Sequence, residues 1–278
     1  MKVVKAEYAG ACYGVQRALD LAYAAIADGD PASTLGPLIH NPQVVDTLTD
    51  LGITAVDSLD DIDEGIVIIR SHGVVPQVKD DAITKGLSIV DATCPHVARA
   101  QKAAADLARD GYFVLVVGES GHPEVEGLFA HAEAQGASAV VVSSVEDIPD
   151  NIKEPVGIVV QTTQSREMLD SIVRALEKRN IDPVVKNTIC FATRQRQDAA
   201  AALADSADAF VIIGGRNSSN TTRLYDICKS TCKKSFHIET PDEIDPAWFK
   251  GCSAIGVTAG ASTPEGQIDA VVARLEKL

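Results

Sequence analysis

The sequence predicts an α/β protein of three small domains, with mainly parallel sheets arranged around a pseudo-threefold axis. Short apolar runs of strand length alternate along the 278 residues with longer patterns of helical period, which is typical of parallel sheets covered by helices. A cysteine stands three times between such a run and the next helical pattern, at Cys12, Cys94 and Cys190. If the three units fold alike, their polar loops and cysteines meet at one central cavity.

The first expected domain covers residues 14–93 and contributes two histidines from strand ends. Its expected elements are helices at 14–27 and 44–51 and strands at 34–35 and 66–69. His40 follows the first of these strands and His72 follows the second. Because polar residues at strand ends collect at the carboxyl edge of a parallel sheet, we expect both imidazoles at that edge.

The second expected domain, residues 94–188, repeats this order. Its expected elements are a helix at 97–109 and strands at 112–117, 139–142 and 156–160. The loop 118–127 carries His122 and Glu124, and Thr162 lies just beyond the last of the strands. These residues are again expected at the carboxyl edge of the sheet.

The third expected domain combines residues 189–278 with residues 1–13. Its expected elements are helices at 192–204 and 224–233 and strands at 3–8, 209–213, 235–238 and 254–257. Two polar loops follow its strands, and they carry Ser218, Ser219, Asn220 and Ser262.

Composition limits the classes of function. The formal net charge of −14 argues against a nucleic-acid binder. No uncharged apolar run approaches the roughly 20 residues of a membrane helix, and no secretory signal stands at the start. We therefore expect a cytoplasmic protein that binds neither nucleic acid nor membranes.

The spacing of the cysteines favours a metal centre over a disulfide scaffold. Six cysteines scattered over so long a chain favour reduced thiols. Cys12, Cys94 and Cys190 each open an expected helix, where the partial positive charge of the helix N-terminus favours a thiolate. Three thiolates suit zinc with an open water site, copper(I), or an iron–sulfur cluster with one iron left for a ligand, and ordinary buried cysteines are the structural alternative.

Cys228, Cys232 and Cys252 form a competing set. Cys228 and Cys232 are four residues apart in an expected helix, so a second metal site with His237 as a further ligand is conceivable. None of the three opens a helix, and we interpret them as small apolar core residues.

The polar loops predict an anion pocket with a proton donor. Hydroxyl, amide and imidazole groups beside backbone N–H groups bind phosphates without many lysines. Glu124 follows a histidine and a proline, which suits proton delivery in a secluded cavity, and Glu126 is either a second candidate or a helix cap. Because the chain has neither a Walker A sequence nor a dinucleotide fingerprint, electrons would have to come from another protein.

Five short motifs, taken together, resemble the 4-hydroxy-3-methylbut-2-enyl diphosphate reductases of the LytB family, which complete the methylerythritol phosphate route to isoprenoids. These motifs are Asp-Ala-Thr-Cys-Pro at 91–95, Gly-His-Pro-Glu-Val-Glu-Gly at 121–127, Gln-Thr-Thr at 161–163, Asn-Ser-Ser-Asn at 217–220 and Thr-Ala-Gly-Ala-Ser at 258–262. The chain departs from the family pattern at Ala11 and Tyr13 around the first cysteine and at Arg194 after the third.

The resemblance implies a 4Fe–4S cluster on Cys12, Cys94 and Cys190. It also implies that Glu124 donates protons, with Thr162 and His122 beside it as catalytic residues. The diphosphate would be bound by His40, His72, His122, Ser218, Ser219, Asn220 and Ser262.

The implied reaction removes the substrate hydroxyl with two electrons and two protons, giving isopentenyl and dimethylallyl diphosphates, with ferredoxin or flavodoxin as electron donor. Two alternatives stay open from the residues alone. A non-redox iron–sulfur hydro-lyase would use the open iron only as a Lewis acid, and a redox or iron sensor would hold a cluster without catalysis.

Overall fold

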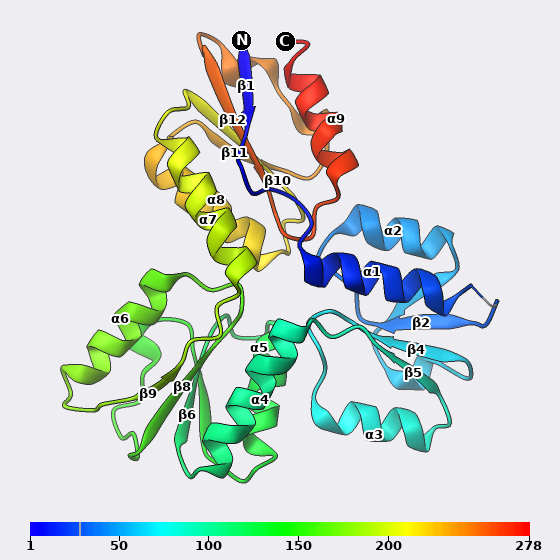
Figure 1. The fold of residues 1–278 in the computed structure, drawn as a ribbon, viewed down its shortest axis with the longest axis vertical. Helices are drawn as coiled ribbons and strands as arrows, with labels where there is room; N and C mark the ends of the chain where they lie inside the picture. Colours follow the sequence, from blue (N-terminus) through cyan, green and yellow to red (C-terminus); the bar gives the residue numbers. More distant parts are fainter. Residues whose placement is uncertain (28) are drawn as a thin grey trace. The chain divides into compact units, whose positions relative to one another are not determined.

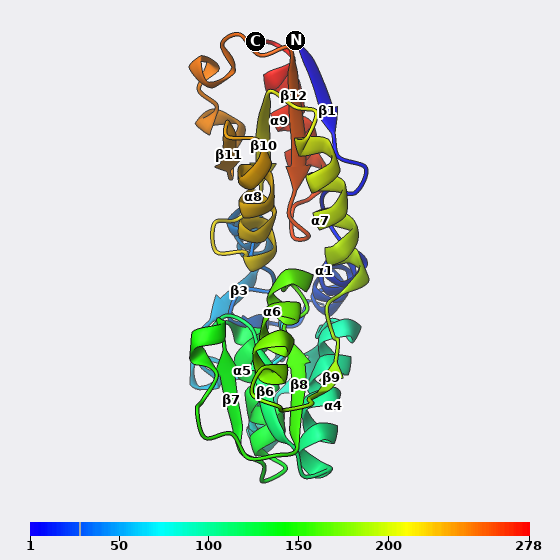
Figure 2. The same ribbon diagram turned by 90° about the vertical axis from the view of Figure 1, so that its left-hand side faces the viewer.

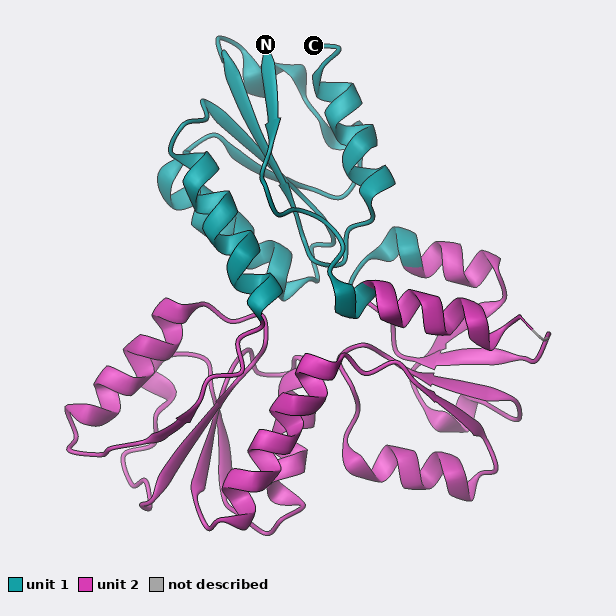
Figure 3. Ribbon diagram, in the orientation of Figure 1, with its two compact units in different colours: residues 1–15, 40–44, 191–278 teal, residues 16–39, 45–190 magenta. Residues whose placement is uncertain are grey.

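The computed structural model describes residues 1–27 and 29–278 (Figures 1 and 2). These residues form three four-stranded sheets in which every strand pair is parallel, which confirms the expected α/β class. The chain divides into two compact units (Figure 3). Unit 1 comprises residues 1–15, 40–44 and 191–278, and unit 2 comprises residues 16–39 and 45–190.

Unit 1 contains one sheet between two layers of helix. Its strands are β1 (Lys2–Lys5), β10 (Ala209–Ile213), β11 (Ser235–Ile238) and β12 (Ala254–Ala259), and its helices are α7 (Phe191–Ala204), α8 (Ser219–Thr231) and α9 (Glu265–Leu275). Figures 1 and 2 show α9 on one face of the sheet and α7 and α8 on the other. Successive residues of β10 point to opposite faces, so Val211 packs in the core with α9 whereas Phe210 packs in the core with α7 and α8.

The first sheet of unit 2 contains β2 (Ala32–Leu35), β3 (Ile53–Val56), β4 (Ile66–Ile69) and β5 (Ser88–Asp91). The helices in this part of the chain are α1 (Tyr13–Ala25), α2 (Pro42–Asp50) and α3 (Pro76–Thr84). Val67 and Ile69 of β4 share a buried core with Ala82 of α3. Ile68 points to the opposite face and is also fully buried, so helices cover both faces of this sheet, as Figure 1 shows.

The second sheet of unit 2 contains β6 (Phe113–Val117), β7 (Ala139–Val142), β8 (Val156–Val160) and β9 (Val184–Lys186). Its helices are α4 (Pro95–Arg109), α5 (Pro123–Glu133) and α6 (Arg166–Glu177). Val114 and Val116 of β6 pack in the core with α4 and α5, whereas Leu115 and Val117 pack in the core with α6.

The three sheets share one strand order. The strands run β3-β2-β4-β5, β7-β6-β8-β9 and β11-β10-β12-β1, so the N-terminal β1 takes the fourth place of the last sheet. In each sheet the chain leaves the two central strands toward opposite faces. α/β sheets bind ligands at this switch point, beyond the carboxyl ends of the two strands. The loops that follow these strands are 36–41, 70–75, 118–122, 161–165, 214–218 and 260–264. They, or the first helical turn after them, contain every residue predicted for substrate binding or proton transfer.

The structure refines several expected elements. The helix expected over 224–233 is α8, which begins five residues earlier because the Ser218 hydroxyl accepts a hydrogen bond from Thr221 N–H and caps it. The strand expected over 3–8 ends at Lys5. Helices α3, α6 and α9 and strand β3 were not expected. Short 3₁₀ helices complete the fold at η1 (Leu59–Asp61), η2 (Val145–Asp147), η3 (Pro241–Glu243) and η4 (Pro246–Phe249).

Each sheet takes its strands from one of the three predicted domains, 14–93, 94–188, and 189–278 with 1–13. The domain boundaries and the pseudo-threefold arrangement stay predictions. Among the described residues, no helix combines the length and the apolar character that crossing a membrane requires.

Candidate active site

Each of the three predicted cysteine ligands makes the same backbone hydrogen bond. Its N–H donates to a carbonyl in the loop that follows the third strand of the same sheet. The bonds run from Cys12 to Ala261 (3.0 Å), from Cys94 to Ser71 (2.9 Å) and from Cys190 to Thr162 (2.9 Å). In two sheets a hydrogen bond two residues earlier, Gly10 to Ala259 and Ala92 to Ile69, shows that this contact continues the parallel ladder.

A helix begins immediately after each of these cysteines, as the sequence predicts. Tyr13, Pro95 and Phe191 are the first residues of α1, α4 and α7. All six cysteines of the chain are free of disulfides. Three thiols in equivalent places, each at a helix N-terminus, have the chemistry that a thiolate-bound metal group requires.

The competing cysteines do not assemble into a site. Cys228 and Cys232 pack in the core beneath α7 and α8, whereas Cys252 packs against the core on the opposite face of the same sheet. Burial and the neighbouring Cys232 raise the pKa of Cys228 to about 12. Cys232 itself is the C-cap of α8 and lies outside the helix. Cys228 and Cys232 are confirmed as buried core residues, whereas Cys252 is half-buried and its Sγ accepts a hydrogen bond from Lys234 Nζ (3.6 Å).

Among the described residues of unit 2, Glu124 is the most deeply buried charged one. It lies in the first turn of α5 and is 1% exposed. Thr162 donates two hydrogen bonds to its carboxyl group, from N–H to Oε1 (2.6 Å) and from Oγ1 to Oε2 (2.9 Å). Burial raises the pKa of Glu124 to about 7, even though both bonds from Thr162 favour the charged form. The group can therefore hold or release a proton near neutral pH.

His122 is fixed in orientation by the helix that carries Glu124. It is the N-cap of α5, and its Nδ1 accepts a hydrogen bond from Glu124 N–H (3.1 Å). Since Nδ1 is the acceptor, the proton of the neutral imidazole belongs on Nε2. Burial, with a contribution from the charge of Arg70, lowers the pKa of His122 to about 4. A neutral ring with an Nε2 donor can bind an anionic oxygen.

His72 and His122 meet although they follow strands of different sheets. Their ring centroids are 5.5 Å apart, in an edge-to-face arrangement. Unit 2 thus brings together the carboxyl edges of its two sheets, and with them His72, His122, Glu124 and Thr162. Glu126, the other carboxyl candidate, accepts a hydrogen bond from Gly121 N–H and is exposed, which fits the capping alternative.

Unit 1 gathers a second group of predicted residues around the segment 40–44. Asn41 donates from Nδ2 to the carbonyl of Ser262 (3.0 Å) and to Gln267 Oε1 (3.0 Å). The Ser262 hydroxyl donates in turn to the carbonyl of His40 (3.0 Å). His40 and Ser262, more than two hundred residues apart in sequence, are thereby held side by side.

The N-terminus of α8 completes this group with Ser218, Ser219 and Asn220, all of which are buried. Asn220 is 4% exposed, and neither its Oδ1 nor its Nδ2 has a hydrogen-bond partner among the described residues. A buried amide with both ends unsatisfied is costly unless a ligand supplies the partners. The polar face of this helix N-terminus therefore fits an anion that accepts from N–H groups.

Arg196 is a residue that sequence reasoning missed. Its guanidinium is 7% exposed and donates to the carbonyls of Gly10 (2.7 and 3.0 Å), Ala11 (3.2 Å) and Ala192 (2.9 Å). It ties the loop before Cys12 to the first turn of α7. The sequence feature that could have revealed it is its position four residues before Ala200, which is buried in the core. Because residues four apart lie on the same face of a helix, Arg196 lies on the apolar face of α7.

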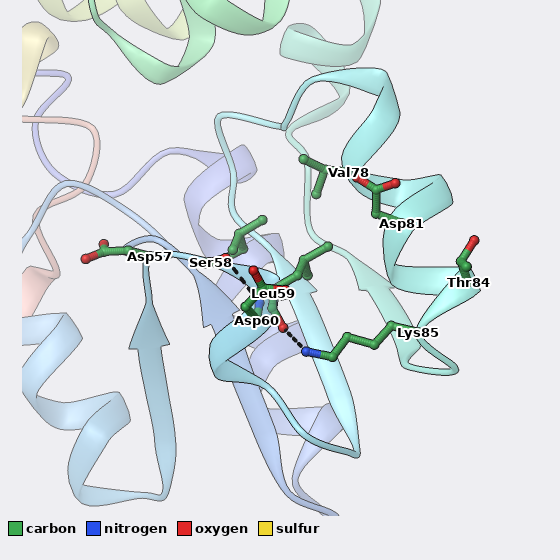
Figure 4. Close-up of a pocket in the computed structure, with 9 residues that line it drawn as sticks. Asp57, Ser58, Leu59, Asp60, Val78, Asp81, Thr84 and Lys85 are labelled. Carbon is green, nitrogen blue, oxygen red and sulfur yellow. Dashed lines mark hydrogen bonds between the residues drawn. The ribbon is translucent and has the colours of Figure 1, made fainter.

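A surface cavity elsewhere in unit 2 plays no part in this site. It has a volume of about 540 Å³ and lies between η1 and α3 (Figure 4). Asp57, Asp60 and Asp81 line it, and Lys85 donates from Nζ to the carbonyl of Leu59 (2.6 Å). No predicted site residue lines it, and its carboxylates would repel a diphosphate.

Comparison with known proteins agrees with the motifs. The profile of a family described as LytB protein matches residues 3–276. The chain belongs to the LytB protein family. It is 45% identical over 277 residues to 4-hydroxy-3-methylbut-2-enyl diphosphate reductase of Geobacter sulfurreducens, covering 100% of this chain and 98% of that one. It is 42% identical to the reductase of the same name from Aquifex aeolicus, covering 99% and 96%.

Two solved structures extend the LytB assignment to the fold. One is (E)-4-hydroxy-3-methyl-but-2-enyl diphosphate reductase, described as the terminal enzyme of the non-mevalonate pathway, with 42% identity, a TM-score of 0.73 and full coverage of both chains. The other is the E-1-hydroxy-2-methyl-but-2-enyl-4-diphosphate reductase from Plasmodium falciparum, with 27% identity, a TM-score of 0.91 and coverage of 98% and 87%. The resemblance inferred from the motifs is confirmed along the whole chain.

The raised pKa of Glu124 predicts a pH-dependent stability difference between wild type and Glu124→Gln. Between about pH 4.5 and 7 the folded chain keeps a proton that the unfolded chain has lost, so stability contributed by this group falls as the pH rises through that window. Glutamine does not titrate. From about pH 5 to about pH 8, the free energy of unfolding of Glu124→Gln, measured with a denaturant, should therefore increase relative to that of the wild type, by up to roughly 3 kcal/mol.

Glu126→Gln, which changes an exposed carboxylate of the same helix, is the matched control. Its free energy of unfolding should differ from that of the wild type by a small amount that stays constant over this pH range. Parallel stability curves for wild type and Glu124→Gln over this pH range would mean that Glu124 titrates like an ordinary carboxyl group.

Proposed function

We propose that this chain is a 4-hydroxy-3-methylbut-2-enyl diphosphate reductase, an oxidoreductase of isoprenoid biosynthesis that removes the substrate hydroxyl as water. Full-length identity of 42–45% to reductases of that name supports the assignment. The structural observation that carries it is Glu124, a buried carboxyl group that holds a proton near neutral pH and is oriented by Thr162. Such a group suits protonation of a leaving hydroxyl.

Diphosphate binding is assigned to the side chains at the switch points. Within unit 1 these are His40, Ser218, Ser219, Asn220 and Ser262, and within unit 2 they are His72 and His122. The unsatisfied amide of Asn220 and the Nε2 donor of His122 support this role. Neutral donors, together with the N-terminus of α8, bind the diphosphate without requiring lysines in an acidic protein.

Proton transfer is assigned to Glu124 with Thr162. A hydroxyl group accepts one hydrogen bond while donating another. When Glu124 is protonated, its O–H can donate to Thr162 Oγ1, which is then free to donate toward the substrate hydroxyl. Thr162 thus orients the leaving group and passes on the proton, while its backbone N–H keeps the carboxyl group in place.

Cys12, Cys94 and Cys190 would hold the 4Fe–4S cluster, because they are equivalent, free of disulfides and placed at helix N-termini. Such a cluster, when bound, supplies electrons and a Lewis-acidic iron. We infer that a ferredoxin or flavodoxin delivers the two electrons, and that the reaction takes place in the cytoplasm, where thiols stay reduced.

Turnover of Glu124→Gln tests the proposal most simply. The purified protein is reconstituted anaerobically and assayed with 4-hydroxy-3-methylbut-2-enyl diphosphate and dithionite. The wild type should form isopentenyl and dimethylallyl diphosphates. Glutamine keeps the shape of the side chain but supplies no acidic proton, so kcat should fall by roughly 100- to 10,000-fold. Iron content should stay at the wild-type level.

The wild-type kcat should also decline as the pH rises above about 7, where Glu124 loses its proton. Turnover without any reductant would support a hydro-lyase instead. A normal rate for Glu124→Gln would remove this residue from the role of proton donor.

Asn220→Ala should weaken substrate binding more than catalysis. The amide is buried and without partners, so the substrate is expected to supply them, and losing those hydrogen bonds should raise KM about tenfold or more. We expect kcat to change much less.

Asn217→Ala is the matched control, since Asn217 lies in the loop just before α8 and is exposed. Equal KM values for the two variants would show that the buried amide does not contact the substrate.

A further inference from the structure

Two of the most exposed aromatic side chains in the described part of the chain stand beside predicted cluster ligands. Tyr13 directly follows Cys12 and is 70% exposed, and Phe191 directly follows Cys190 and is 59% exposed. Tyr8, which is 39% exposed, lies in the loop that leads to Cys12. Only 4% of the residues are aromatic, and aromatic residues on a protein surface are enriched where it binds other proteins.

Arg196 brings the two aromatic positions together within unit 1. The same buried guanidinium binds the carbonyl of Ala11, two residues before Tyr13, and the carbonyl of Ala192, one residue after Phe191. The loop before α1 and the first turn of α7 are thus fixed against each other. We refer to Tyr8, Tyr13 and Phe191, the exposed aromatic residues of these two neighbouring segments, as the aromatic patch.

Arg194 adds a positive charge to this patch. Its guanidinium lies over the Phe191 ring, with its central carbon 5.7 Å from the ring centroid, which is the geometry of a cation–π contact. It is exposed and makes no ion pair within residues 1–27 and 29–278. The charge is therefore available to a carboxylate of a partner, in a chain whose formal net charge is −14.

We propose that the aromatic patch with Arg194 is the docking surface for the electron donor, a small acidic carrier protein of the ferredoxin type. Aromatic residues and arginine are enriched in protein–protein interfaces. An acidic carrier is repelled by the net charge of this chain and attracted locally by Arg194.

The inference rests on the proposed function, because only a reduction needs a donor. The reaction consumes two electrons and two protons for each hydroxyl released as water. Two reduced one-electron carriers supply the electrons and leave oxidised by one electron each. Docking over the residues next to Cys12 and Cys190 shortens the electron path to the group that these cysteines would hold.

The test compares two reductants on the reconstituted holoenzyme. Tyr13→Ser and Arg194→Glu should each raise KM for reduced ferredoxin about tenfold or more, as removal of an interface anchor does. Turnover with dithionite and methyl viologen, small reductants that need no docking surface, should stay unchanged, as should iron content. The wild-type KM for ferredoxin should rise with salt, and Arg194→Glu should weaken that dependence.

Tyr23→Ser and Arg274→Glu are the matched controls, an exposed tyrosine of α1 and an exposed arginine of α9, and both should behave like wild type. Binding of oxidised ferredoxin, measured by calorimetry, should weaken in parallel with KM and does not depend on turnover.

An unchanged ferredoxin KM and affinity in both patch variants would overturn the docking surface. So would a change in solution mass on Tyr13→Ser with an unchanged KM, which would make the patch a contact between copies of this chain. Absence of wild-type turnover with dithionite would instead count against the proposed function, and the binding measurement would still decide the docking surface.

Discussion

One backbone hydrogen bond, made once in each sheet, positions the chemistry of this chain. The N–H of a cysteine beyond the fourth strand donates to a carbonyl beyond the third, from Cys12 to Ala261, from Cys94 to Ser71 and from Cys190 to Thr162. It joins a thiol to a switch-point loop, where the chain already collects polar side chains. Because the strand order is the same in all three sheets, the cysteines are equivalent although they lie far apart in sequence.

Burial shifts the pKa values of Glu124 and His122 in opposite directions, and each shift favours the neutral form. Burial makes the charged form costly for an acid and a base alike. Glu124 therefore keeps a proton near neutral pH, and His122 stays neutral. Below about pH 7 a site built this way adds little negative charge against an anionic substrate, and it offers hydrogen-bond donors for the diphosphate. The hydrogen bonds from Thr162 moderate the effect and leave a pKa that allows both proton donation and recovery.

Several parts of this structure could be predicted from sequence because they depend on local patterns. The apolar runs 66–69, 139–142, 156–160, 209–213 and 235–238 became strands with those bounds. The cysteines, loop histidines and Glu124 stood out because each follows an apolar run. Strand order could not be predicted, since pairing such as that of β1 with β12 depends on residues more than two hundred positions apart. Arg196 escaped for the same reason, because its partners Gly10 and Ala11 are distant in sequence.

The most direct test of the account is the iron and sulfide content of anaerobically reconstituted single variants. Wild type and Cys228→Ser, a control in the apolar core, should bind a complete 4Fe–4S cluster with its broad visible absorption. Cys12→Ser, Cys94→Ser and Cys190→Ser should each lose iron, sulfide and absorption, because one cluster depends on all three thiolates. A wild-type cluster in any one of these three variants would contradict the assignment of the cysteines to a single centre.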